Sequence, residues 1–128
     1  MYQKWEEKFS VGVEKFDSQH KQMLDKVNQL YDEIHSGHDQ KRLKELLTQL
    51  VVITEKHFAD EENDLKDKDY PELLDHIDEH NNLLQEIHSL KDLYLADRLV
   101  LDDEVIGFLA NWLGVHTTET DSGYSHLF

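Results

Sequence analysis

The sequence contains no cysteine, one proline and five glycines among its 128 residues. The lack of cysteine excludes disulfides, thiolate catalysis, iron–sulfur clusters and zinc–thiolate sites together. So few prolines and glycines do not suit a turn-rich β protein. Basic residues are also scarce, since 13 Lys and Arg stand against 28 Asp and Glu, giving a formal net charge of −15. This balance argues against nucleic acid or an anionic membrane as the main partner, because phosphate binding needs a basic patch.

Long apolar runs are missing as well. No stretch approaches the roughly 18–20 residues needed to span a bilayer. The first ten residues, MYQKWEEKFS, carry charges where a signal peptide would need an apolar run. The length and a hydrophobic fraction of 38% suit one core, so we expect a single domain over residues 1–128. These features predict a soluble, cytoplasmic protein.

Apolar residues recur at helical spacing in four segments, which follow an N-terminal arm covering residues 1–16. Gly37 is the predicted stop signal of the first helix. The residues expected to cap or open the four helices are, in chain order, Asp17 or Ser18, Asp39, Pro71, and Asp102 or Asp103. Helices of this length with short connections predict an all-α fold, an antiparallel up-down four-helix bundle.

Histidines form the most informative pattern. His57 and Glu61 are four residues apart, as are His76 and His80, so each pair lies on one face of its helix. In both helices that face is also the apolar one. A lone histidine on an apolar face is usually a hydrogen-bonded core residue, but two consecutive helices with such pairs are hard to explain in that way. Burying these groups costs several kcal/mol unless something compensates them, and a metal can.

Three more residues extend this pattern. His20 lies on the apolar stripe of the first helix, and His116 lies near the end of the fourth. Asp121 follows His116 by five residues, where we expect the helix to end and the chain to turn inward. Five imidazoles and two carboxylates suit iron, with zinc or manganese as alternatives. Seven ligands are too many for one metal, so the pattern predicts a dinuclear site in the bundle core.

These residues resemble the hemerythrin family, specifically its single-domain bacterial members. The similarity runs through Trp5, VGV at 11–13, DSQHK around His20, HFADEE from His57, HIDEH from His76, and NWLGVH with the trailing Asp121. It covers nearly the whole chain. All seven metal-ligand positions of the family hold the expected residue types, in the order H, HxxxE, HxxxH, HxxxxD.

The resemblance implies a four-helix bundle that holds two iron ions joined by an oxo or hydroxo bridge. One iron would be bound by three histidines, His76, His80 and His116. The other would be bound by two, His20 and His57, which leaves it five-coordinate. Glu61 and Asp121 would bridge the two ions.

The function implied by the resemblance is reversible dioxygen binding, for oxygen storage, delivery or scavenging. Dioxygen would bind end-on at the five-coordinate iron as a hydroperoxide, with no catalytic residue required. The residues implied to line its pocket are Met23, Trp112, Leu113 and Thr117. Thr117 departs from the family, in which this position often holds a bulky aliphatic residue. Its hydroxyl would either contact the bound hydroperoxide or admit water and hasten autoxidation, or it would have no effect.

Two other classes of function stay open. A di-iron centre supplied with electrons could act as a redox enzyme or protective protein that reduces peroxide, dioxygen or nitric oxide, or handles iron. The domain could also be an oxygen- or iron-responsive sensor module. We expect a binding protein rather than an enzyme, and a monomer. An unknown protein could receive the oxygen or donate electrons.

Overall fold

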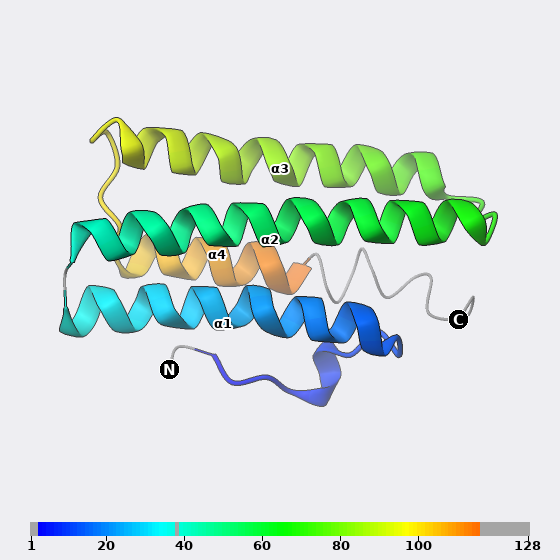
Figure 1. Cartoon of the computed structure of the whole chain (residues 1–128), viewed down its shortest axis with the longest axis horizontal. Coiled ribbons are helices and arrows are strands. Elements are labelled where there is room, and N and C mark those ends of the chain that lie inside the picture. Colours follow the sequence, from blue (N-terminus) through cyan, green and yellow to red (C-terminus); the bar gives the residue numbers. More distant parts are fainter. Residues whose placement is uncertain (1–2, 38, 116–128) are drawn as a thin grey trace.

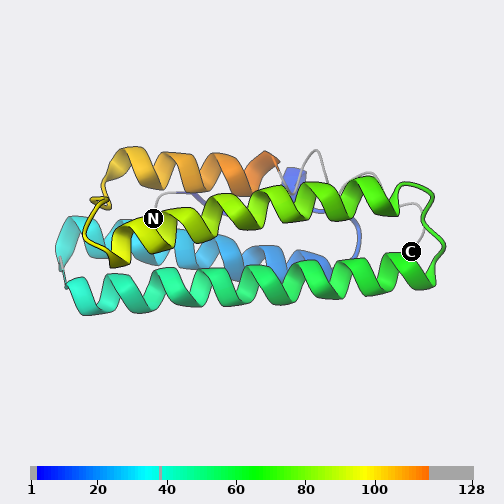
Figure 2. The ribbon, with the colours of Figure 1, turned by 90° about the horizontal axis from the view of Figure 1, so that it is seen from above.

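The computed structural model of the chain describes residues 3–37 and 39–115, and over these ranges its regular secondary structure consists of helices (Figure 1). A short 3₁₀ helix precedes four α-helices. They are η1 (Glu7–Phe9), α1 (Glu14–Ser36), α2 (Gln40–Asp67), α3 (Leu73–Leu95) and α4 (Asp103–Val115). Successive helices run in opposite directions (Figures 1 and 2). The predicted all-α, up-down four-helix bundle is therefore confirmed.

Each helix turns its apolar stripe towards the bundle axis. The main core includes the fully buried Leu30 of α1, Leu46 and Leu47 of α2, Ile87 of α3 and Leu109 of α4. A smaller cluster, made of Val11, Phe16, Leu65 and Tyr70, closes the end of the bundle where α1 begins and α2 ends. Within the described ranges, no helix is both long enough and apolar enough to cross a membrane.

The start of α1 differs from the prediction. The helix begins at Glu14, three residues before the predicted cap Asp17, so the arm is shorter than 16 residues. Asp17 does not cap the helix, because its carboxylate accepts hydrogen bonds from Val11 N (2.8 Å) and Ser10 Oγ (2.5 Å). It ties the arm to α1 instead. Nearer the N-terminus, the arm is held by Asn28 of α1. Its Oδ1 accepts from Gln3 N at 2.8 Å, and its Nδ2 donates to Gln3 O at 2.7 Å.

The start of α3 also differs from the prediction. Pro71 was expected in the first helical turn, but it lies in the turn before α3, which begins at Leu73. Leu73 N donates to Tyr70 O at 3.2 Å, which puts Pro71 at the second position of a tight turn, where its fixed φ is favoured. The predicted caps Asp39 and Asp102 are confirmed, since each side chain accepts from a backbone N–H of the helix that follows it.

Candidate metal centre

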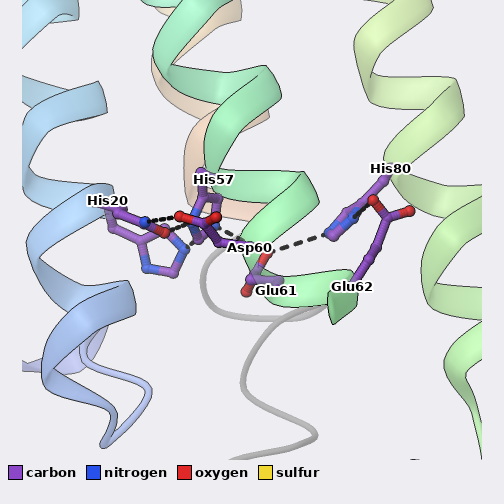
Figure 3. Close-up of polar contacts among 7 residues, drawn as sticks. His20, His57, Asp60, Glu61, Glu62 and His80 are labelled. Atoms are coloured by element: carbon purple, nitrogen blue, oxygen red, sulfur yellow. Dashed lines mark hydrogen bonds and ion pairs between the residues drawn. The ribbon is translucent and has the colours of Figure 1, made fainter. Parts of the chain in front are cut away.

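Five of the predicted ligands meet in one half of the bundle, on the side of the smaller apolar cluster. They come from three helices: His20 from α1, His57 and Glu61 from α2, and His76 and His80 from α3. His76 is 5% exposed and the other four are fully buried. Figure 3 shows Glu61 between His20 and His57 on one side and His80 on the other. The i, i+4 spacing in α2 and α3 therefore points both pairs inward, as predicted.

Glu61 connects two groups of donor atoms. Its Oε1 lies 2.9 Å from His57 Nε2 and 3.3 Å from His80 Nε2. His20 Nε2 lies 2.8 Å from His57 Nε2. One ligand atom from each of His20, His57 and Glu61 lies within 4.8 Å of the others, and the same holds for Glu61, His76 and His80. A carboxylate shared by two such groups is in the position of a bridge.

Burial keeps two of the imidazoles neutral. It lowers the pKa of His20 from 6.5 to about 3, with His57 as the next cause, and it lowers the pKa of His76 to about 4, with His80 as the next cause. A neutral imidazole presents a nitrogen lone pair, which is the form that binds a metal. At neutral pH both residues are therefore prepared to act as ligands.

The donor set fits a pair of first-row transition-metal ions. The five described donors are buried and carry one negative charge, that of the Glu61 carboxylate. Two divalent cations bound between them would more than balance this charge. Nitrogen and carboxylate donors without sulfur suit iron, zinc or manganese.

Aromatic side chains wall the donors in. The Phe58 ring stacks on His80 at a centroid distance of 3.9 Å and an interplanar angle of 5°. Phe16 meets His57 edge-on at 5.9 Å, and Tyr70 meets His76 edge-on at 6.2 Å. These contacts hold the imidazole planes in place and keep bulk water from the donors.

Polar residues outside the donor set lie near the Nδ1 atoms of two of the histidines. Gln19 Oε1 lies 2.5 Å from His57 Nδ1, and Gln19 Nε2 lies 2.7 Å from Asp60 Oδ2. On the other side, Glu62 Oε2 lies 4.0 Å from His80 Nδ1. Burial raises the pKa of the Glu62 carboxyl above its ordinary value.

The remaining predicted site residues fall into two sets. Met23, Trp112 and Leu113 are buried, in the same apolar cluster as Phe58. His116, Thr117 and Asp121 lie outside the described residues, so their predicted roles stay predictions.

Sequence reasoning missed Gln19 and Phe58. The only signal for Gln19 is that it directly precedes a predicted ligand, and its contact with His57 depends on how α1 is rotated against α2. Phe58 reads as an ordinary core residue in the apolar stripe of α2. Asp60 directly precedes the predicted ligand Glu61, and its bond to Gln19 makes it an outer carboxylate of the site.

Fold and site together define a class: four-helix bundles with a histidine and carboxylate metal site between the helices. A family model described as the hemerythrin HHE cation-binding domain matches residues 11–127. The chain belongs to the hemerythrin family, and this membership implies a non-haem di-iron site.

Individual relatives agree with this assignment. A bacteriohemerythrin of Pseudomonas aeruginosa is 29% identical over 120 residues, covering 94% of this chain and 77% of that protein. One of Clostridium acetobutylicum is 25% identical, covering 94% of this chain and 96% of that protein. The myohemerythrin of Theromyzon tessulatum is 30% identical, covering 94% and 88%. A crystal structure of wild-type hemerythrin superimposes with a TM-score of 0.91 at 26% identity, covering 99% of this chain and 98% of that one.

Proposed function

We propose that the protein binds dioxygen reversibly at a di-iron centre, for oxygen storage, delivery or scavenging. The observation that carries this proposal is the position of Glu61, whose carboxylate reaches a histidine group on each side. A pair of iron ions held by these residues would supply the site for dioxygen and the two electrons needed to bind it.

The chain's own residues provide two unequal positions. His20 and His57 serve one position, while His76 and His80 serve the other together with the predicted His116. Glu61 links them, and Asp121 is predicted as the second bridge. The position with fewer imidazoles is the one that would accept dioxygen.

The walls of the site support binding over turnover. Phe58 stacks on His80, and Met23, Trp112 and Leu113 are buried in the same apolar cluster as Phe58. Such surroundings exclude the water and protons that would otherwise displace bound oxygen and leave an inert oxidised centre. We therefore propose a binding protein rather than an enzyme. A protein that receives the oxygen or donates electrons is compatible with this role.

The proposal is tested by loading the full-length protein with ferrous iron under argon and recording its visible spectrum. An absorption band should appear on adding air and disappear under argon, over repeated cycles. A band that never forms, or one that decays at once to the oxidised centre, would shift the assignment to oxidative or peroxidatic chemistry. Failure to bind two irons per chain would contradict the ligand assignment itself.

A further inference from the structure

We propose that Asp60 acts through Gln19 as a positioning residue for His57, holding the ring proton of His57 on Nδ1 so that Nε2 presents its lone pair to a metal. This inference rests on the metal centre of the proposed function. It adds two residues, neither of which would touch a metal ion.

The three side chains form a continuous chain of contacts between α1 and α2. His57 Nδ1 lies 2.5 Å from Gln19 Oε1, and Gln19 Nε2 lies 2.7 Å from Asp60 Oδ2. His57 is fully buried, whereas Gln19 and Asp60 are half-buried at the edge of the bundle. Asp60 directly precedes Glu61, so α2 carries the inner carboxylate and the outer one on adjacent residues.

The chemistry of the three groups fixes the direction of every hydrogen bond. An ionised carboxylate can only accept, so Asp60 requires the NH₂ group of Gln19 to face it. The amide oxygen of Gln19 then faces His57, and an amide oxygen can also only accept. His57 Nδ1 must therefore carry the proton, which leaves the lone pair of a neutral ring on Nε2.

The opposite arrangement would disable the ligand. If the Gln19 amide were flipped, its NH₂ group would donate to His57 Nδ1, and a neutral ring would have to carry its proton on Nε2. That proton would lie where His57 approaches Glu61 and His20. Asp60 prevents this, because a flipped amide would bring two acceptor oxygens together.

Zinc binding to the full-length protein tests this inference without any need for oxygen. In competition titrations against a chromogenic chelator, the wild type should bind two zinc ions. Gln19→Met removes both hydrogen bonds and should weaken one of the two positions by roughly 10- to 100-fold, the usual cost of losing the partner of a metal-bound histidine. Asp60→Asn should weaken the same position by about two- to tenfold, since a neutral group that can donate replaces a charged acceptor.

A double substitution tests whether the loss of zinc affinity comes from the direction of the hydrogen bonds or from altered packing. Gln19→Glu combined with Asp60→Asn exchanges the amide and the carboxylate but still presents an acceptor to His57. It should restore zinc affinity relative to Asp60→Asn alone. In the zinc-loaded wild type, the Nδ1 proton of His57 should be protected from exchange in histidine-ring ¹H–¹⁵N spectra, and Asp60→Asn should speed its exchange.

Asp64→Asn is the matched control, because Asp64 lies one turn beyond Asp60 on α2 and pairs with Lys15 at 3.0 Å instead. This variant should leave the zinc affinity of both metal positions unchanged. Unchanged zinc affinity in both Gln19→Met and Asp60→Asn would overturn the inference, as would an equal loss in Asp64→Asn. If Gln19→Met does not fold, as judged by circular dichroism, the half-buried Asp60→Asn decides alone. A wild type that binds no zinc would instead count against the metal centre, and so against the proposed function.

Discussion

The two halves of the bundle use the same helical positions for opposite purposes. In one half, α1, α2 and α3 fill the core with residues such as Leu30, Leu47 and Ile87. In the other half, the same stripes continue with His20, His57 and His80, equally buried. The apolar half lowers the free energy of the fold by removing hydrocarbon from water. In the polar half, donor atoms take the place of hydrocarbon, so this contribution to stability is smaller there.

This difference shows how the fold tolerates the site. Neutral imidazoles cost less to bury than charged groups, and burial lowers the pKa values of His20 and His76 so that both are neutral at pH 7. Glu61 is the one buried carboxylate among the described residues. We expect the metal-free polar half to be the weaker part of the bundle, and metal binding to strengthen it.

The largest effect is expected from Glu61→Leu, which makes the polar half resemble the apolar one. The variant should lose binding of the paired metals, because the group shared by both positions is gone. Its metal-free form should be as stable as the wild type or more so, since replacing a buried charged group by a well-packed apolar one is often neutral or stabilising. Metal analysis and urea unfolding would measure the two effects.

Glu62→Gln is the control for this variant, because Glu62 is adjacent to Glu61 but stands behind His80. It should keep two metals per chain. Retention of paired metal binding by Glu61→Leu would contradict the bridging role.

Leu47→Ala should have the next largest effect, this time in the apolar half. Leu47 is fully buried, so the cavity should lower the free energy of unfolding by about 2–5 kcal/mol. The metal content of the folded protein should not change. Urea unfolding with Leu74→Ala as an exposed control would measure the loss, and a loss of metal without a loss of stability would contradict the separation of the two halves.

Acid should weaken the metal-free protein through the polar half. The pKa values of His20 and His76 are about 3 and about 4 in the folded state, against 6.5 for a free histidine. Between these values the unfolded chain binds more protons, so stability is full above pH 6.5, falls as the pH drops below 6.5, and levels off below the folded pKa values. At about pH 5 the expected loss is roughly 2 kcal/mol per histidine.

Urea unfolding of metal-free protein at about pH 7.5 and about pH 5 would measure this loss. His20→Leu should show a smaller pH dependence than the wild type. Equal slopes in the two proteins would mean that His20 is not a source of the acid sensitivity.

The smallest effect is expected at the ends of the helices, outside both halves. Asp69 and Asp97 follow α2 and α3 with φ values of 53° and 60°, and the next residue in each case closes the helix end by bonding back to Leu65 O or Leu93 O. Glycine adopts this conformation without strain. Asp69→Gly should therefore raise the free energy of unfolding by up to about 1 kcal/mol, as measured by urea unfolding. Asp67→Gly, inside the last turn of α2, should lower it instead, and the same sign for both would contradict this explanation.

The sequence allowed the buried faces of the helices to be predicted but not all of their ends. Helical spacing placed Leu47, His57 and His80 inward because 3.6 residues per turn determines which residues share a face. The predicted start of α1 was wrong because Asp17, a residue type favoured at helix caps, binds the arm instead. No glycine marks the ends of α2 and α3, where aspartate adopts a positive φ. The link from His57 to Asp60, both on α2, passes through Gln19 of α1, so it depends on a rotation of the two helices that neither helix sequence determines alone.

Oxygen uptake by the iron-loaded protein is the most direct measurement. An oxygen electrode would follow the addition of dioxygen to ferrous protein of known iron content, and then its release under argon. The polar half, as described, predicts one dioxygen per two irons, recovered on release and taken up again in the next cycle. Continued oxygen consumption beyond that ratio, or no uptake by a protein that holds two irons, would contradict reversible oxygen binding.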